Sequence, residues 1–467
     1  MDITNLTIND IINGYKEKKF SVSEVVNSYV ARIEKLNPKL NAFITIDSEN
    51  AKRKAKELDD KVSSSPLHGV PFGIKDMFLT KGVKTTAASN VLKDYIPHYS
   101  ATVVDRLETA GAISLGKLNH DAWAHGSSGE NSDFGNTLNP WDTNYVPGGS
   151  SSGSSASVAS GMVPFATGTD TGGSIRLPAS FTNTVGLKPT YGLVPRYGVI
   201  SMASSLDSMG HFTKNVSDSA EILNITAGFD GYDATSSERE MENYSALLGK
   251  DIKGLTIGVP KEYISTGLSS DVKEVFENAL KTLEKLGAEV VEISLPHTDE
   301  GIAVYYIIQP SEVSSNLARY DGIRYGNERS HFGKEAKRRI MLGTFTLSSG
   351  YYDAYYKRAM QVRTLIKDDF DNAFKKVDVL VSPVSPTPPW KFGEKTNDPL
   401  AMYLSDALTV TINLAGVPGL AVPAGFSANK LPIGIQFIGP HFSESKLFQV
   451  GYAFEQETGF YKHTPNI

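Results

Sequence analysis

The stretch from Val146 to Phe181 reads VPGGSSSGSSASVASGMVPFATGTDTGGSIRLPASF and is the most informative part of the sequence. Of the fifteen residues from Pro147 to Gly161, seven are serine and four are glycine. This composition is typical of a flexible linker, yet the stretch continues directly into an apolar segment that glycine again interrupts. The small residues between Ala156 and Met162 also suit a closely packed helix. We therefore interpret the stretch as part of a folded core.

The rest of the chain alternates between strand-like and helix-like segments. Residues 252–296 read as a β-α-β unit: GLTIGVP, a helix capped by Ser269 or Ser270 and ended by Gly287, and AEVVEISLP. Short apolar runs typical of buried strands recur elsewhere, as in GVPFGI, GAISLG, GLAVPAGF and PIGIQFIG. This alternation predicts an α/β fold with a buried parallel or mixed sheet.

The chain shows no separate linker, so we expect one domain over residues 1–467. Ser21 and Glu24 form a capping box before a helical pattern that we expect to end at Asn37-Pro38. We divide the domain into a helical N-terminal segment (1–65), a catalytic core (66–215), and the remaining sheet and helices with residues of the substrate pocket (216–467).

The composition excludes several classes of protein. With a formal net charge of −6 and no basic stripe, the chain lacks the positive surface of a stand-alone nucleic-acid binder. It contains no cysteine, which excludes disulfides, cysteine-ligated zinc and a thiol nucleophile. The opening MDITNLTIND does not resemble a signal peptide, and no apolar run reaches the roughly 18 residues of a membrane span. We expect a cytoplasmic protein that does not bind membranes.

Three familiar kinds of site fit poorly. GAISLGKL at residues 111–118 resembles a P-loop, but Leu118 stands where a hydroxyl would bind magnesium. GSSSG at residues 149–153 fits a nucleophile elbow, but the preceding NPWDTNYVP is turn-like and not an apolar strand. The histidines are scattered, and the five-residue spacing of His120 and His125 does not place both on one helix face. We predict no metal site.

A different chemistry emerges from three segments: GVPFGIKDMF with Lys75, VPGGSSSGS with Ser150, and ATGTDTGGSIRLP with Ser174. Burial of Lys75 among apolar residues would lower its pKa and make it a candidate base. A hydroxyl between a base and a nucleophile relays a proton, because it accepts on one side and donates on the other. Gly172 and Gly173 allow successive N–H groups to point at one oxyanion. Such a set performs acyl transfer without histidine.

These segments resemble the amidase signature family, whose members hydrolyse amides through a lysine, a serine that follows a cis peptide bond, and a nucleophilic serine. The spacings agree with the family, with 75 residues from Lys75 to Ser150 and 24 from Ser150 to Ser174. The resemblance implies that Lys75 is the general base and acid. Ser150 would be the bridging serine after a cis bond from Gly149, and Ser174 the nucleophile. The implied fold is a large central mixed β-sheet covered on both faces by α-helices.

The resemblance also places an oxyanion hole in the loop that leads to Ser174. Its donors would be the backbone N–H groups of Thr171, Gly172, Gly173 and Ser174. Asp170 and Arg176 would hold this loop in place.

Longer segments, such as GKLNHDAWAHGSSGENSDFGNTLNPW and VGLKPTYGLVPRYGVISMASSLD, look like the glutamine-hydrolysing subunits of tRNA-dependent amidotransferases within that family. Glutamine needs a cation for its carboxylate and an anion for its amino group. The resemblance implies Arg339 for the first, with Arg338 its neighbour, and Asp406 for the second. Tyr305 or Tyr306 would line the same pocket. The alternative for each residue is a surface ion pair or a core aromatic.

The same resemblance implies partners. The released ammonia would pass to a second subunit that amidates Glu or Asp already attached to tRNA, in a heterotrimer in which the partner contacts most of the tRNA. No cofactor is expected in this chain, and ATP and Mg²⁺ are expected in the partner. Two other hypotheses are a stand-alone amidase for a small or aryl amide and a non-catalytic scaffold.

Three departures from the family pattern stand out. Ser152 occupies a position where the family usually has glycine, and Gly129 one where it frequently has threonine. The segment around residues 327–333 is also shorter than expected, which puts any partner or tRNA contact made there in doubt.

Overall fold

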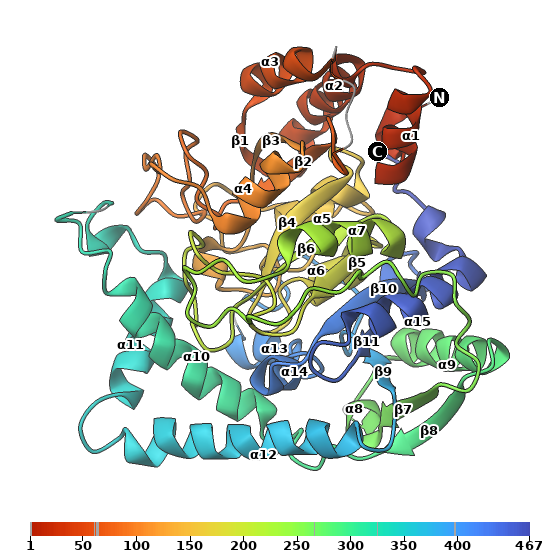
Figure 1. Cartoon of the computed structure of the whole chain (residues 1–467). Coiled ribbons are helices and arrows are strands. Elements are labelled where there is room, and N and C mark those ends of the chain that lie inside the picture. Colours follow the sequence, from red (N-terminus) through yellow and green to blue (C-terminus); the bar gives the residue numbers. More distant parts are fainter. Residues whose placement is uncertain (1, 60, 62–64, 266, 325, 397) are drawn as a thin grey trace.

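Strands from the whole length of the chain form one mixed β-sheet (Figure 1), in a computed structural model that describes residues 2–467 apart from 60, 62–64, 266, 325 and 397. The strands are β1 (Phe43–Ile46), β2 (Pro71–Lys75), β3 (Ile113–Leu118), β4 (Phe165–Asp170), β5 (Val185–Lys188), β6 (Ser208–Thr213), β7 (Thr256–Pro260), β8 (Glu289–Ile293), β9 (Val379–Pro383), β10 (Gly419–Phe426) and β11 (Pro432–Ile438).

The sheet has 11 strands in the order β1-β3-β2-β4-β6-β5-β10-β11-β9-β7-β8. β2 lies parallel to β3 and β4, and β7 lies parallel to β8 and β9. The central pairs from β4 to β9 are antiparallel. The α/β fold with a mixed sheet, predicted from the sequence, is therefore confirmed.

The helices fill the connections between strands. They are α1 (Ile8–Lys16), α2 (Val22–Leu40), α3 (Ser48–Asp59), α4 (Thr102–Thr109), α5 (Ser152–Ala159), α6 (Arg176–Thr182), α7 (Val216–Thr226), α8 (Lys261–Ser265), α9 (Ser270–Lys285), α10 (Gly301–Leu317), α11 (Lys334–Thr346), α12 (Arg358–Ala373), α13 (Pro399–Leu404), α14 (Val410–Ala415) and α15 (Glu444–Thr458). Short 3₁₀ turns are η1 (Ile3–Asn5), η2 (Ala122–Ala124), η3 (Arg329–His331) and η5 (Phe460–Lys462), and η4 (Asp353–Lys357) is π-helical.

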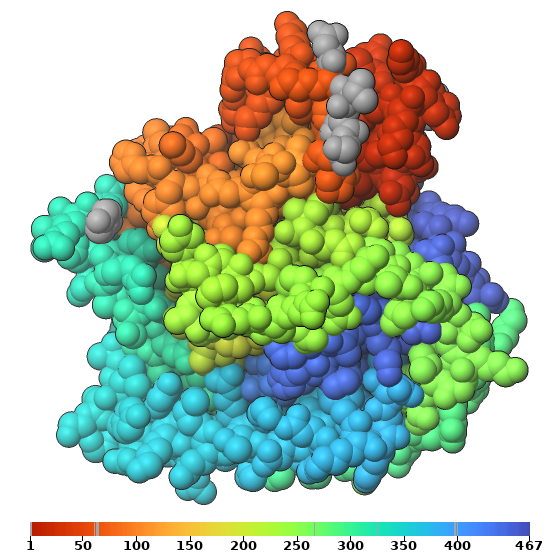
Figure 2. All heavy atoms as spheres, in the orientation of Figure 1, coloured from red at the N-terminus to blue at the C-terminus, as the bar shows by residue number. Residues whose placement is uncertain are grey.

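Strand β10 shows that helices cover both faces of the sheet. Leu420 and Val422 contact α15 at Gly451, whereas the intervening side of the strand at Gly419 faces Arg176 of α6. Because successive side chains of a strand point to opposite faces, α15 and α6 lie on opposite sides of the sheet. In the space-filling view, the light green segment after β6 crosses the front between the orange N-terminal part and the blue C-terminal part (Figure 2).

The predicted β-α-β unit at residues 252–296 is confirmed as β7, α9 and β8. Ser269 is the N-cap, its hydroxyl accepting from the N–H of Val272, and Gly287 follows the last turn with φ +91°. The buried apolar residues of α9 recur at helical spacing, which is why this unit could be predicted from the sequence.

The predicted end of the first long helix at Asn37-Pro38 is wrong. The helix α2 continues through Pro38 to Leu40, and Asn41 ends it in the left-handed conformation. Proline removes only one backbone hydrogen bond there, and burial of Leu36 and Leu40 against the core keeps the last turn in place. The tertiary contacts thus outweigh the local signal.

Candidate active site

Two strands that lead into the predicted catalytic segments end at the same edge of the sheet. Lys75 is the last residue of β2 and Asp170 the last of β4, and these strands are parallel neighbours. The carboxyl ends of parallel strands meet at the same edge, where α/β proteins place their ligands. A hydrogen bond also joins the ends of β2 and β4, since the backbone N–H of Lys75 donates to Thr167 Oγ1 at 2.9 Å.

Three hydroxyl groups surround the Lys75 amine. Its Nζ lies 2.9 Å from Ser150 Oγ, 2.8 Å from Ser151 Oγ and 2.7 Å from Thr169 Oγ1, and the side chain is fully buried. A neutral amine can donate two of these hydrogen bonds and accept the third. The arrangement therefore suits a lysine that gains and loses a proton without losing its partners.

Burial lowers the pKa of Lys75 to about 7, and the carboxylates of Asp121, Asp170 and Asp207 act in the opposite direction. The shift follows the expected sign for an amine taken out of water. At neutral pH a substantial fraction of Lys75 is therefore an uncharged base. This is the condition that the sequence-based hypothesis requires.

The peptide bond between Gly149 and Ser150 is cis, as predicted. Helix α5 begins directly after it, and the N–H of Ser151 donates to the carbonyl of Ser174 at 3.3 Å, which joins the two serine segments. Among the described residues, no hydrogen bond joins the hydroxyls of Ser150 and Ser174. Catalytic hydrogen bonds often close only when substrate is bound, so this link stays a prediction.

Ser151 and Thr169 were missed in the sequence analysis. No pattern in the sequence assigned Ser151 a chemical role, but its hydroxyl contacts the Lys75 amine and donates to Thr169 O at 3.2 Å. Two successive serines, Ser150 and Ser151, therefore contact the same lysine amine. Thr169 could have been found from the alternation of β4, in which Thr167 and Thr169 share a face.

The predicted oxyanion loop is held by a buried ion pair. Arg176 Nη2 lies 3.1 Å from Asp170 Oδ1, and Asp170 also accepts from the N–H groups of Gly173 and Ile175. Burial alone would raise the pKa of Asp170, but the Arg176 guanidinium holds it well below its usual range. The prediction that Asp170 and Arg176 anchor this loop is confirmed.

This geometry divides the predicted oxyanion donors. The N–H of Gly173 already donates to Asp170 at 2.8 Å, so its assignment as a free donor is wrong in this structure. Among the described residues, the N–H groups of Gly172 and Ser174 have no acceptor. Thr171 contributes its hydroxyl to Asp207 at 2.7 Å. Since that contact leaves the backbone N–H of Thr171 unused, Thr171, Gly172 and Ser174 stay predicted oxyanion donors.

The predicted glutamine-binding residues gather beside Ser174, which is half-buried. Residues from distant parts of the chain line one small pocket: Ala124, Gly126, Ser127, Gly172, Ser174, Met202, Tyr305, Tyr306, Arg339 and Asp406. The pocket thus combines a serine hydroxyl, one cation and one carboxylate.

The carboxylate of Asp406 is held by two hydroxyl groups. Ser127 Oγ donates to it at 2.8 Å and Tyr306 Oη at 2.9 Å. Burial raises the pKa of Asp406 to about 6. Tyr305 contacts Gly172, where an added Cβ would lie 2.6 Å from the Tyr305 ring. Both tyrosines therefore belong to the pocket, and the contribution of Ser127 had no clear signal in the sequence.

The two neighbouring arginines of α11 have different environments. Arg339 is buried at 4% exposure, with its Nε 2.9 Å from Glu335 Oε1 and its guanidinium over the Tyr306 ring. Arg338 is exposed and contacts the other oxygen of Glu335. The structure thus places Arg339, and not Arg338, in the pocket. Its contact with glutamine stays a prediction.

Two departures from the family pattern lie against each other. Gly129 has φ +87°, and a Cβ added there would lie 2.8 Å from Ser152 Cβ. Ser152 is buried, and its hydroxyl donates to Thr137 Oγ1 at 3.3 Å. Only one of the two positions can carry a side chain in this backbone. The serine at 152 is therefore matched by the glycine at 129.

Replacing Gly129 with alanine should destabilise the protein by about 2 kcal/mol, from overpacking together with the left-handed backbone. In a Ser152→Gly background the overpacking should disappear while the backbone strain stays. Urea unfolding of the two single variants and the double variant should give a favourable coupling free energy of about 1 kcal/mol. Additive effects would show that the two positions do not compete for space.

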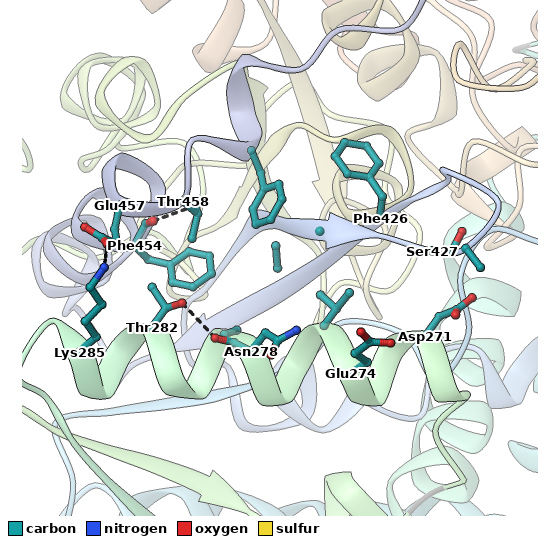
Figure 3. Close-up of a pocket in the computed structure, with 16 residues that line it drawn as sticks. Asp271, Glu274, Asn278, Thr282, Lys285, Phe426, Ser427, Phe454, Glu457 and Thr458 are labelled. Atoms are coloured by element: carbon teal, nitrogen blue, oxygen red, sulfur yellow. Dashed lines mark hydrogen bonds and ion pairs between the residues drawn. The ribbon is translucent and has the colours of Figure 1, made fainter.

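A second concave region contains none of the predicted site residues. It is a groove between α9, the end of β10 and α15, lined by Asp271, Phe426, Phe454 and Glu457 among others (Figure 3).

Within the residues that the structure describes, no group of three or more His, Asp or Glu side chains could hold a metal ion, and no helix is long and apolar enough to cross a membrane. The pocket beside Ser174 is thus the candidate active site.

The fold and this pocket define an amide-hydrolysing class of enzyme. The chain belongs to the amidase family, whose model matches residues 24–448. A solved bacterial aryl acylamidase of the amidase signature family superposes with a TM-score of 0.87 at 27% identity, covering 98% of this chain and 97% of that one.

Two relatives with higher sequence identity are both A subunits of glutamyl-tRNA(Gln) amidotransferases. The chain is 52% identical, over all of both sequences, to the A subunit of the glutamyl-tRNA(Gln) amidotransferase of Geobacillus sp. (strain WCH70). The solved structure of the corresponding A subunit from Thermotoga maritima has a TM-score of 0.85 at 42% identity, covering 98% of this chain and 95% of that one.

Proposed function

We propose that this chain is the glutaminase component, or A subunit, of a glutamyl-tRNA(Gln) amidotransferase. It hydrolyses glutamine to glutamate and ammonia. A partner subunit uses the ammonia to convert Glu-tRNA(Gln) to Gln-tRNA(Gln), or Asp-tRNA(Asn) to Asn-tRNA(Asn). The observation that carries the proposal is the pocket in which Ser174 lies with both Arg339 and Asp406. A free amino acid carries one anion and one cation, and this pocket offers one partner for each. The full-length similarity to A subunits supports the same substrate.

In the proposed mechanism, neutral Lys75 takes a proton through Ser150 as Ser174 Oγ attacks the side-chain carbonyl carbon of glutamine. Backbone N–H groups of the loop hold the oxyanion of the tetrahedral intermediate. Lysinium Lys75 then returns the proton, through Ser150, to the departing nitrogen, and the C–N bond breaks to release ammonia. Water attacks the glutamyl ester on Ser174 by the same path in reverse and releases glutamate.

The partners in this proposal are the B and C subunits, which complete a heterotrimer in the cytoplasm. The partner uses ATP and Mg²⁺ and contacts most of the tRNA, and this chain uses no cofactor. A net charge of −6 agrees with such a division, since tRNA binding depends on basic surfaces.

Co-expression with candidate B and C subunits tests the function. The complex should release ammonia from glutamine and form Gln-tRNA(Gln) from Glu-tRNA(Gln) with ATP. Parallel assays with and without charged tRNA, and with Asp-tRNA(Asn), define which tRNA is used and whether it controls the glutaminase. Efficient hydrolysis of aryl amides by the single chain, with no effect of the other subunits, would instead favour a stand-alone amidase.

Arg339 and Arg338 provide a matched pair of variants. Arg339→Ala should raise the KM for glutamine by about ten-fold or more, because a charged hydrogen bond to the substrate carboxylate is lost. Arg338→Ala, on the same helix and with the same Glu335 partner, should leave the KM unchanged. Steady-state glutaminase assays, with ammonia-dependent amidation as a check on folding, measure this difference. Equal effects of the two variants on the KM would contradict the proposal that Arg339 binds the carboxylate of glutamine.

A further inference from the structure

Thr409 is a fully buried threonine that the proposed mechanism does not use. It stands at the N-cap position of α14, where a threonine side chain commonly accepts a hydrogen bond from the first turn of its own helix. Thr409 makes no such capping bond. Its hydroxyl instead donates to the carbonyl of Gly172 at 2.6 Å, in the loop that leads to Ser174. A hydroxyl directed away from its own helix and into this loop calls for an explanation.

The peptide group between Gly172 and Gly173 is held at both ends. Its carbonyl oxygen accepts from the Thr409 hydroxyl, and its N–H donates to Asp170 Oδ1 at 2.8 Å. Thr409 also lies against the Cα of Gly173, since a Cβ added there would overlap Thr409 Oγ1. The plane of this peptide therefore cannot rotate without breaking a buried hydrogen bond, which is costly.

This held peptide lies between two of the predicted oxyanion donors. The N–H of Gly172 precedes it and the N–H of Ser174 follows it, with Gly173 at φ +129°. Among the described residues, neither of these two N–H groups has an acceptor. A fixed plane between them keeps both in one arrangement before the substrate binds, which is the preorganisation that an oxyanion hole requires.

Thr409 also belongs to the turn that carries Asp406. Its backbone N–H donates to the carbonyl of Asp406 at 3.0 Å, and its hydroxyl lies at the same distance from that oxygen. The carbonyl of Thr409 accepts from Arg176 Nη2 at 3.1 Å. One residue therefore joins the carboxylate proposed for the substrate amino group to the loop proposed for the oxyanion.

We propose that Thr409 is a positioning residue for amide hydrolysis: its hydroxyl holds the Gly172–Gly173 peptide so that the N–H groups beside it face the oxyanion, and its turn fixes this loop relative to Asp406. The distance between the amino-group site and the oxyanion site, which has to match the length of glutamine, is thereby set before the substrate binds. The proposal rests on the proposed function for the identity of this substrate.

Replacing Thr409 with valine removes the hydroxyl and nearly keeps the shape of the side chain. The carbonyl of Gly172 then loses this partner, and the kcat for glutamine should fall about ten-fold, because the oxyanion donors are no longer held in place. The KM should change by less than about two-fold, since the lost interaction acts in the transition state. Thr409→Ser keeps the hydroxyl and should retain about half or more of the wild-type kcat.

Two rates test this proposal. One is steady-state glutamine hydrolysis by the assembled complex. The other is modification of Ser174 by phenylmethanesulfonyl fluoride, which needs no glutamine and brings a sulfonyl oxygen to the oxyanion donors. Thr411→Val is the matched control, because Thr411 is a buried threonine of the same helix whose hydroxyl contacts Tyr263 Oη instead. Both rates should fall in Thr409→Val, recover in Thr409→Ser and stay at the wild-type value in Thr411→Val.

A folded Thr409→Val enzyme with an unchanged kcat would overturn the proposal. So would a rise in KM alone, a Thr409→Ser enzyme as slow as Thr409→Val, or an equal loss in Thr411→Val. Thr409→Cys, which is similar in size and a weak donor, serves if the valine variant does not fold. Failure of both to fold would reject the proposal, because Thr409 would then be a structural anchor alone. Slower modification in Thr409→Val, in a protein whose wild type hydrolyses no glutamine, would uphold Thr409 and reject the proposed substrate.

Discussion

Replacing Ser174 with alanine will abolish glutamine-dependent formation of Gln-tRNA(Gln) by the assembled complex and leave ammonia-dependent formation unchanged. The substitution removes one hydroxyl oxygen from a half-buried position in the pocket and leaves the backbone N–H groups in place. Without that oxygen no glutamyl ester can form. External ammonia enters after this step, so the partner's reaction continues.

The measurement is amidation of charged tRNA with glutamine or ammonium chloride as the nitrogen donor. Ser160→Ala is the control, since Ser160 is a buried serine whose hydroxyl donates only within its own helical segment. It should retain both activities. Loss of both activities in Ser174→Ala would mean that the substitution disturbs assembly, and retention of both would remove Ser174 as the nucleophile.

Replacing Lys75 with methionine will lower the glutaminase rate by about a thousand-fold, the contribution of a positioned general base. Methionine keeps the length and burial of the side chain but leaves the hydroxyls of Ser150, Ser151 and Thr169 without their common partner. The KM for glutamine should change little, because Lys75 does not line the pocket.

Lys214→Met is the matched control for this variant. Lys214 is a largely buried lysine whose amine donates to the carbonyl of Thr4 at 2.6 Å, in another part of the molecule. Pre-steady-state assays of ammonia release should show a loss in Lys75→Met and none in Lys214→Met. Thermal unfolding of both variants separates loss of the base from loss of the fold. A Lys75→Met enzyme at wild-type rate would require a different base.

The local elements of the fold could be predicted because their signals are local. The amphipathic spacing and Ser269 cap of α9 lie within one short segment. The strand order could not be predicted, since β5 pairs with β10 across about half of the chain. Pro38 shows that a local signal can also mislead. Asn37-Pro38 is a strong local signal for a helix end, but burial of the last turn of α2 outweighed it.

The candidate site divides in the same way. Lys75, Ser150 and Ser174 could be predicted as site residues because their segments carry a recognisable motif, and the cis bond, which the structure contains, was predicted from the same resemblance. The contact of Ser127 with Asp406 joins residues 279 positions apart, so no pattern along the chain indicates it. The occupied N–H of Gly173 likewise depends on where Asp170 points, which only the folded loop determines.

Acid quenching of the complex during glutamine turnover, followed by peptide mass spectrometry, tests the central claim most directly. The account predicts a glutamyl adduct on the peptide that contains Ser174. The adduct should be absent from Ser174→Ala and should form far more slowly in Lys75→Met. An active enzyme that carries the adduct on another residue, or that forms none under conditions where wild-type turnover is limited by hydrolysis of the ester, would contradict it.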